Sequence, residues 1–564
     1  MSDILNQSIR EAVADLLRAG VENYLKSAGA QIETPEITLD LPRHADHGDW
    51  ASSLPLRLAK PLKKNPFDVA EGIVAAMPAS DLIQPPEVAR PGFINFRLAS
   101  GSIAHLVRRV LALGEKYGHS TVFNKERVLV EFVSANPTGP LHIGHGRGAV
   151  IGDTLARIFA AAGYGVSREY YYNDAGVQMK TLGESLRIRY LQALGEAVPF
   201  IENGYKGDYM VELGQKLAAE RGDSMKTITD TQPFTDYAAN FIIALINEDL
   251  ERLRIHFDTW FSETTLHKDG KVEQALNELE SRGKLYEQDG AKWLASAEYG
   301  DEKDRVVIKS DGNYTYLAPD IAYHAYKFER GFTRLVNVLG ADHHGYIPRL
   351  KAAIQALGHR PDQLDCVLVQ MVAVERAGEA MKLSTRAGDF ITLKEVLDEI
   401  GVDVTRFLFL TRTADSQMVF DFELAKDTSM DNPVYYVQYA HARCCSLARK
   451  AEELGQAWAG GEAADLALLT APEEKALAHQ MDRFPQIVVE AATQAEPVLV
   501  TSYLRDLATA FHSYFTAGNK DDSLRVVQAD NAALTQARLT LIAALKRTFA
   551  NALDLLGVTP LERL

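Results

Sequence analysis

Two histidines three positions apart, His142 and His145, are the residues of this 564-residue chain whose spacing most directly suggests chemistry. Side chains three apart at the start of a helix can face one point. That point lies near free backbone N–H groups and the positive end of the helix dipole, where phosphate is stabilised. Gly144 and Gly146 leave room for a base or a phosphate against the backbone. Imidazoles there can donate hydrogen bonds to the oxygens of a pentavalent phosphorus without acting as acid or base catalysts.

The same pair has two other interpretations. Histidines in a tight turn between a strand and a helix can cap the helix or hydrogen-bond within the core, and a lone His-x-x-His pattern favours this structural role. A zinc site is less favoured still, because no third or fourth ligand lies nearby in the sequence. The surrounding residues must therefore decide between phosphate chemistry and a structural role.

The segment around the histidines predicts a strand, a turn, a helix and a second strand. Residues 128–133 form an apolar, β-branched run typical of a buried strand, and the Pro- and Gly-containing stretch 136–140 breaks the chain. A helical pattern then ends before Gly163, and a second strand is predicted over 166–172. Such a unit belongs to a parallel sheet, whose ligands bind beyond the carboxyl ends of the strands.

The string Pro140-Leu-His-Ile-Gly-His145 resembles the HIGH signature of class I aminoacyl-tRNA synthetases. With Glu131-Phe-Val-Ser-Ala-Asn136-Pro-Thr-Gly before it, the segment resembles the arginyl-tRNA synthetases, of the bacterial type. The resemblance implies an α/β catalytic domain with a Rossmann-type parallel sheet, which uses ATP accompanied by Mg²⁺. It implies that His142 and His145 are catalytic, and that Pro140, Gly144 and Gly146 lie at the ATP site.

Length and composition limit the class of protein. The chain is too long for a single core, so three or four domains are expected. It shows no apolar run long enough to span a bilayer and no signal-peptide pattern at its N-terminus. Three cysteines form no disulfide framework, which favours a cytoplasmic protein. A net charge of −16 argues against a general nucleic-acid coat but allows a local RNA-binding surface.

Residues 1–115 are expected to form an α+β unit of their own. A helix is predicted over 9–25 and strands over 37–41 and 91–97. His and Asp residues between positions 43 and 50 could suggest a metal site, but a polar loop before a helix, capped by Asp49 or Ser52, is favoured. The His-Gly-Asp-Trp string followed by a helix resembles the additional N-terminal domain of the family. The resemblance implies that this domain contacts the elbow of the tRNA.

A second group of polar residues follows a predicted hairpin over 306–317. Asp320 lies in the first turn of the next helix, four residues after Tyr316, so both could point into one pocket. A carboxylate can pair with a guanidinium in a bidentate geometry. Taken singly, these residues favour structural roles: a hairpin Tyr and a helix-start Asp here, and a paired strand Glu and a turn Asn for Glu131 and Asn136. The resemblance implies that all four hold the substrate arginine.

A third polar turn follows the predicted strand 335–339. It contains Asp342, His343 and His344, which could bind a metal ion. The resemblance instead places this turn beside the adenylate. It implies that Asp342 and His343 contact ATP and that His344 contacts arginine, so no metal site is expected.

A polar, glycine-containing loop over 375–389 follows a strand predicted over 367–374. Within it, Lys382-Leu-Ser-Thr-Arg386 is similar to the KMSKS loop, which implies catalytic roles for Lys382 and Arg386 and an ATP contact for Ser384. The sequence departs from the motif because its second lysine is replaced by Thr385, and Gly139 stands where some members carry a compensating lysine. The alternative is an ordinary exposed charged loop.

The remaining predictions concern domain organisation. A Rossmann catalytic domain is expected over 120–400, with a polar helical insertion at about 180–265. Thr392 and Glu395 predict a capping box that opens a helix. Residues 403–564 are expected to be helical and to resemble the family's anticodon-binding domain. Its aromatic residues either form the bundle core or stack on unpaired bases.

The resulting hypothesis is a ligase that activates L-arginine with ATP and transfers it to the 3′ end of tRNA(Arg). Activation is expected to require bound tRNA, and the enzyme is expected to be a monomer. Small adenylyltransferases are disfavoured because they stop after one nucleotide domain. A non-catalytic tRNA-binding paralogue is the alternative, and only Thr385 favours it.

Overall fold

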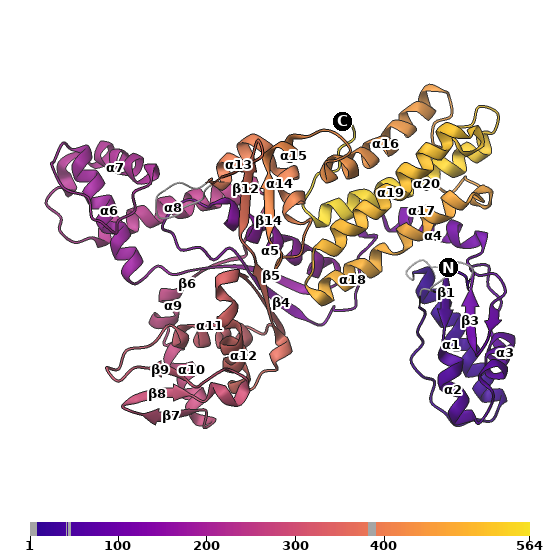
Figure 1. Ribbon diagram of the computed structural model, residues 1–564, viewed down its shortest axis with the longest axis horizontal. Helices are drawn as coiled ribbons and strands as arrows, with labels where there is room; N and C mark the ends of the chain where they lie inside the picture. The colour runs from indigo at the N-terminus through magenta and orange to yellow at the C-terminus, as the bar shows by residue number, and fades with distance from the viewer. Residues whose placement is uncertain (1–7, 41, 43–46, 382–390) are drawn as a thin grey trace.

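The computed structural model describes residues 8–40, 42, 47–381 and 391–564. Figure 1 shows a central sheet with a helical projection on one side and a long helical bundle on the other. The N-terminal unit lies beside the far end of the bundle. Within the described ranges, no helix is long and apolar enough to cross a membrane.

The central sheet has five parallel strands in the order β11-β10-β4-β5-β6. Their bounds are Arg127–Glu131 (β4), Gly165–Tyr172 (β5), Thr259–Ser262 (β6), Arg334–Gly340 (β10) and Leu364–Val369 (β11). The first strand in the chain, β4, is central, and the strand order reverses between β4 and β10. This reversal is the topological switch point at which open α/β sheets bind ligands. The prediction of a Rossmann-type α/β fold is confirmed.

Helices cover the sheet and begin where its strands end. The helix α5 follows β4, and α11 and α12 flank β10 in the chain. Their bounds are Ile143–Ala161 (α5), Leu317–Glu329 (α11) and Ile347–Ala356 (α12), with the short helices Glu263–Lys268 (α9) and Lys271–Ser281 (α10) after β6. The predicted strand–turn–helix–strand unit is therefore present as β4, α5 and β5.

Several predicted elements differ from the structure. The strand β6 lies in a segment predicted to be helical, because a four-residue edge strand carries too little periodicity to be recognised. The strand predicted over 367–374 is two strands, β11 and Val372–Arg376 (β12). The strand β12 belongs to a separate sheet with Glu379–Met381 (β13) and Met418–Asp421 (β14). Residues 367–374 were predicted as one strand because the parts that belong to the two sheets are both largely apolar. The strand β14 also interrupts the region after residue 403, which was predicted to be all helical.

A three-stranded antiparallel sheet precedes α11. It consists of Leu285–Gln288 (β7), Ala291–Leu294 (β8) and Arg305–Ile308 (β9), in that order. The predicted hairpin is present only in part. Tyr314 forms an isolated bridge to Ile308, and the return strand ends there because α11 begins at Leu317.

The helical insertion between β5 and β6 forms the projection on the left of Figure 1. It comprises Val177–Ala193 (α6), Asp208–Arg221 (α7) and Gln232–Arg252 (α8). The helix α6 packs against both α7 and α8 through buried apolar residues that include Leu182, Leu213 and Ile242.

The N-terminal unit packs three helices on a three-stranded sheet of order β1-β3-β2. Its elements are Ile9–Ser27 (α1), Trp50–Ser52 (β1), Leu54–Leu62 (α2), Pro66–Ala76 (α3), Glu87–Ala89 (β2) and Phe93–Phe96 (β3). One prediction was wrong here and another holds in part. Residues 37–40 form no strand, apart from a bridge between Asp40 and Ala51. The N-cap position of α2 is Ser53, which makes no side-chain cap bond, and the Asp49 carboxylate accepts from the Leu98 N–H instead. The Ser52 hydroxyl does accept from the first N–H of the helix, that of Leu54 (3.3 Å).

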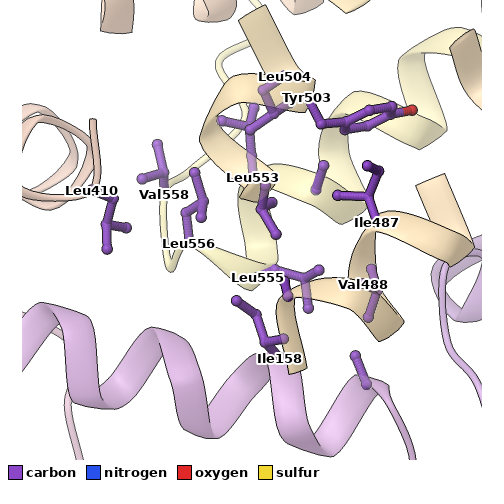
Figure 2. Close-up of a cluster of buried hydrophobic side chains, with 14 of the residues drawn as sticks. Ile158, Leu410, Ile487, Val488, Tyr503, Leu504, Leu553, Leu555, Leu556 and Val558 are labelled. Carbon is purple, nitrogen blue, oxygen red and sulfur yellow. The ribbon is translucent and has the colours of Figure 1, made fainter. Parts of the chain in front are cut away.

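The C-terminal bundle packs directly on the helix that begins at the histidine turn. Its helices are Ser100–Leu113 (α4), Pro433–Glu453 (α16), Pro472–Asp482 (α17), Phe484–Gln494 (α18), Val498–Lys520 (α19) and Ala532–Leu555 (α20), with Leu393–Ile400 (α13), Val402–Phe409 (α14) and Phe422–Lys426 (α15) joining it to the sheets. In Figure 2, Ile158 of α5 lies among Val488 of α18 and Leu555 of α20. The helix α4 packs on α17 and α20, although it precedes the catalytic sheet in the chain.

Arg406 of α14 links α5 to the ends of the insertion and the bundle, and it is fully buried. Its guanidinium donates to Asp153 Oδ2 (2.6 Å), Leu253 O (2.7 Å) and Leu556 O (2.8 Å). We expect Arg406→Met to lower the thermal unfolding midpoint, because each carbonyl left without a donor costs about 1–3 kcal/mol. The exposed Arg360, which pairs with the exposed Asp362, provides the control: Arg360→Met should change the midpoint little. Equal midpoints for the two variants would contradict the expectation.

Candidate active site

The turn after β4 places the two histidines face to face. His142 is the N-cap of α5, and its Nδ1 accepts hydrogen bonds from the N–H groups of Gly144 (3.1 Å) and His145 (3.3 Å). His145 Nδ1 accepts in turn from the His142 N–H (3.3 Å). The rings are stacked with their centroids 3.7 Å apart. The two histidines therefore cap the helix, as the structural interpretation expects. Their stacked rings also face the same way, as the phosphate interpretation requires.

These hydrogen bonds fix which ring nitrogens carry protons. Because both Nδ1 atoms accept, each neutral imidazole must carry its proton on Nε2. Burial lowers the pKa of His142, and burial together with the neighbouring His142 lowers the pKa of His145 to about 3. Both rings are therefore neutral at pH 7. They are suited to donate hydrogen bonds through Nε2 rather than to deliver or remove protons.

The glycines of the turn have different surroundings. Among the described residues, a Cβ at Gly144 would meet only the His142 ring, 3.0 Å from its Cε1. Gly146 is buried, and a Cβ there would lie 2.7 Å from Leu393 Cδ1. This contact gives Gly146 a packing role, and its predicted place at the ATP site stays a prediction. Its missing side chain allows α5 to pack against α13.

The histidine turn is also tied to the chain that follows the predicted KMSKS-like loop. The Ile143 N–H donates to Ile391 O (3.2 Å), and the Leu393 N–H donates to Leu141 O (2.8 Å). Lys382, Ser384 and Arg386 lie outside the described residues. Thr392 and Glu395 form the predicted capping box at the start of α13, which is confirmed.

Carboxylates converge near the first turn of α11. Asp320 is half-buried and accepts a hydrogen bond from the Tyr346 hydroxyl. Burial, with repulsion from Glu263 and Glu131, raises the pKa of Asp320 to about 7. Glu263, at the start of α9, accepts a hydrogen bond from the Tyr171 hydroxyl (2.5 Å). A site that raises a carboxyl pKa by crowding negative charge is suited to a cationic ligand.

Glu131 ends β4 and is buried beside Asp320, but it already has a cationic partner. Its Oε2 accepts from Lys327 Nζ (2.6 Å) and its Oε1 from Ser134 Oγ (3.0 Å). Burial opposes ionisation of Glu131, but Lys327 outweighs it, so the pKa of Glu131 is lowered. The contacts of Glu131 therefore match the structural interpretation, in which it is a strand residue paired with a neighbouring side chain.

We expect Lys327→Met to be strongly destabilising. Lys327 is fully buried, and its removal leaves the Glu131 charge without a counter-ion, which costs about 3–5 kcal/mol. The double variant Glu131→Gln/Lys327→Met should recover part of this loss, because it removes the buried charge as well. Thermal unfolding of both variants measures the difference, and a double variant no more stable than Lys327→Met would contradict the argument.

Asn136 and Tyr316 are the other two residues that the sequence predicts to hold arginine. Asn136 donates to Gln178 Oε1 (2.9 Å) and accepts from the Asn173 N–H (3.1 Å). Tyr316 is 85% exposed, and Asp320 lies four residues further along the chain. Tyr316 is the N-cap of α11 and already has helical backbone angles (φ −59°, ψ −24°), so their spacing is compatible with one helical face, and a shared arginine pocket stays a prediction.

The polar turn after β10 lies at the same sheet edge. Asp342, His343 and His344 occupy a 3-10 helix, Ala341–Tyr346, and all three are exposed. His343 Nε2 lies 3.8 Å from Asp342 Oδ2. In the part of the chain that the structure describes, no three metal-ligating side chains gather where they could hold an ion.

Three contributors to the site were not recognised from the sequence: Glu263, Tyr346 and Lys327. Glu263 directly follows β6, so the rule that ligands bind at carboxyl ends of strands would have found it, had β6 been recognised. Lys327 gave no local signal, since it is 196 residues from its partner Glu131.

The Rossmann sheet with a stacked histidine pair at its switch point belongs to a class I aminoacyl-tRNA synthetase, as the match to a family model shows. The family model described as the catalytic domain of class I (R) tRNA synthetases matches residues 106–418. The arginyl-tRNA synthetase N-terminal domain matches residues 3–98, and the DALR anticodon-binding domain matches residues 437–564.

Known relatives identify the particular family. The chain is 44% identical over 568 residues to an arginine–tRNA ligase of Bacillus licheniformis, covering 100% of this chain and 99% of the relative. A solved arginyl-tRNA synthetase of Campylobacter jejuni is 35% identical with a TM-score of 0.74, covering 83% of this chain and 100% of that one. The Thermus thermophilus arginyl-tRNA synthetase shares the fold, with a TM-score of 0.75 at 24% identity over 98% of this chain and 100% of that one. The chain belongs to the arginyl-tRNA synthetase family.

Proposed function

We propose that the enzyme activates L-arginine with ATP and transfers it to the 3′ end of tRNA(Arg), with activation dependent on bound tRNA. The arginine carboxylate attacks the α-phosphorus of ATP, arginyl-adenylate forms and pyrophosphate leaves. A hydroxyl of the terminal adenosine of the tRNA then attacks the activated carbonyl, and AMP leaves. The observation that carries this proposal is the crowding of Asp320, Glu263 and Glu131 beside the histidine turn.

The acidic group explains a preference for arginine. We assign the bidentate contact with the guanidinium to Asp320, because Glu131 is already paired with the Lys327 ammonium. The Asp320 carboxylate, in contrast, accepts a hydrogen bond from a neutral donor, the Tyr346 hydroxyl. We assign Glu131 and Asn136 to the walls of the arginine site. Tyr316 and His344 are exposed beside it, and we assign them contacts that form when arginine binds.

The phosphate side of the site is assigned to the histidine turn. His142 and His145 donate from Nε2 to the transferring phosphate, whose charge grows in the transition state. Pro140 and Gly144 line the nucleotide's approach, with Asp342, His343 and Ser384. Lys382 and Arg386 supply the cations for pyrophosphate, without a lysine at Thr385 or Gly139.

The donor set suits Mg²⁺ carried in by ATP. Mg²⁺ is commonly held by substrate phosphates and water with one or two carboxylates. Asp342 is an exposed carboxylate at the sheet edge and is the residue placed to contact such an ion. The ion supplies charge neutralisation on the phosphates.

We assign tRNA contacts to the N-terminal unit, the catalytic domain and the C-terminal bundle. We propose an elbow-binding domain within 1–115, whose last helix α4 packs on the bundle, a catalytic domain over 120–400 with its insertion at about 180–265, and an anticodon-binding domain over 403–564. The N-terminal unit and the bundle lie on one side of the catalytic sheet, so a single tRNA can reach all three (Figure 1). We further propose a cytoplasmic monomer.

Arginine-dependent exchange of pyrophosphate into ATP, measured with and without tRNA(Arg), tests the proposal. Exchange that requires tRNA is the expected result. Absence of exchange in both conditions, from a folded protein that still binds the tRNA, would overturn the proposal and favour the non-catalytic paralogue. No observation in the structure favours that alternative, because the histidine pair and the acidic site are both intact.

A further inference from the structure

The turn between β4 and α5 contains strained backbone. Val133 and Ser134 have φ angles of 67° and 42°, in the left-handed region that non-glycine residues rarely adopt. Valine is especially unfavourable there because it is β-branched. Such strain persists only where surrounding contacts determine the conformation.

The first half of the turn is held by residues at the end of β5. The Tyr170 hydroxyl donates to Ala135 O (2.8 Å), and the Asn173 N–H donates to Asn136 Oδ1 (3.1 Å). These contacts come from the catalytic sheet itself. They fix the chain as far as Asn136 and leave the following residues, 137–140, to other partners.

The second half of the turn is held by the helical insertion. The Tyr209 hydroxyl, in the first turn of α7, donates to Thr138 O at 2.6 Å. The Tyr209 ring lies against Gly139, where an added Cβ would be 3.2 Å from its hydroxyl oxygen. A neighbouring insertion residue, Tyr205, is anchored to α6, because its N–H donates to Ser185 Oγ (3.0 Å).

Thr138 lies two residues after Asn136 and four before His142, so it connects the arginine side of the turn to the phosphate side. We propose that Tyr209 is a positioning residue through which the helical insertion holds this turn in its reactive geometry. The inference rests on the proposed function and gives the insertion a part in arginine activation. A displacement of about 1 Å at a reacting group can cost on the order of 10²-fold in rate.

The variant Tyr209→Phe tests the inference, because it keeps the ring and removes only the hydroxyl. We expect kcat/KM for arginine in tRNA-dependent pyrophosphate exchange to fall about tenfold, with a raised KM for arginine and an unchanged KM for tRNA. Tyr237→Phe is the matched control. Tyr237 belongs to the same insertion, and its hydroxyl donates to Glu220 Oε2 (2.9 Å), away from the turn.

The KM for arginine separates positioning from a merely structural role. Loss of folded enzyme lowers the rate without changing KM, so a Tyr209→Phe variant with a lower rate and an unchanged KM would overturn the inference. Kinetics equal to those of Tyr237→Phe, in a preparation whose wild type is active, would also overturn it. Absence of exchange in the wild type would overturn the proposed function and this inference with it.

Discussion

His142→Asn is expected to lower tRNA-dependent arginine activation by about 10²-fold while leaving the fold intact. Asn is among the best N-cap residues, and its Oδ1 can replace His142 Nδ1 as the acceptor for the N–H groups of Gly144 and His145. The variant therefore keeps the cap of α5 and removes the Nε2 donor. Pyrophosphate exchange measures the loss, and thermal unfolding measures the cap.

Two further variants complete the test. His142→Ala removes both cap and donor, so it should lose the same activity and also about 1 kcal/mol of stability. His359→Asn is the control, because its ring is likewise stacked on a neighbour, Phe328, with centroids 3.7 Å apart. Retention of full activity by His142→Asn would show that the histidine serves only as a cap.

The pH dependence follows from the lowered pKa values of both histidines. In the folded protein His145 stays neutral down to a pKa of about 3, whereas an unfolded histidine takes up a proton near 6.5. Between these values the unfolded state binds more protons, so this pair's contribution to stability falls as the pH falls below 6.5. The activity defect of His142→Asn should be constant from pH 7 to pH 9, because the wild-type rings remain neutral there.

Asp320→Asn should raise the KM for arginine by about 10²- to 10³-fold. Removing one partner of a buried charge pair costs roughly 2–5 kcal/mol. The amide keeps the shape and can still accept from Tyr346. Asp362→Asn makes the same charge change on an exposed residue next to the start of β11, at the opposite edge of the sheet, and should leave the KM unchanged. A normal KM in Asp320→Asn would exclude Asp320 as the guanidinium partner.

The raised pKa of Asp320 adds a pH signature. Only the ionised carboxylate pairs with the guanidinium, so the wild-type KM for arginine should rise as the pH falls below about 7, and the Asn variant should lack this rise. The effect of pH on stability runs the other way from its effect on arginine binding. The folded pKa lies above the ordinary value of 3.8, so the stability contributed by Asp320 is lost as the pH rises from about 4 to 7. At pH 8 the Asn variant should therefore unfold at a higher temperature than the wild type.

Patterns confined to neighbouring residues were predicted well. The unit of β4, α5 and β5 followed from hydrophobic periodicity and from Gly163 after the helix. The capping box at Thr392 followed from residues three apart. These predictions succeeded because helix caps and helical faces depend on contacts within a turn or two of the same chain segment.

Elements defined by distant pairing were predicted poorly. The strands β6, β12 and β14 are short, and each is a strand only because a partner lies beside it. The strand β12 pairs on one side with the nearby β13 and on the other with β14, which is more than forty residues away in the chain. Strand propensity depends on such neighbours, so a short apolar segment read alone is compatible with helix or strand.

The sequence by itself determined the family, the order of the motifs along the chain and the position of the histidine pair at a helix start. Each of these depends on short runs of contiguous residues. Only the tertiary structure decided which of these carboxylates has a cationic partner and which has a raised pKa. Glu131 is neutralised by Lys327, 196 residues away, whereas Asp320 is crowded by Glu263 and Glu131. Charge state and partner depend on burial and on side chains from distant strands and helices, and these become neighbours only when the sheet forms.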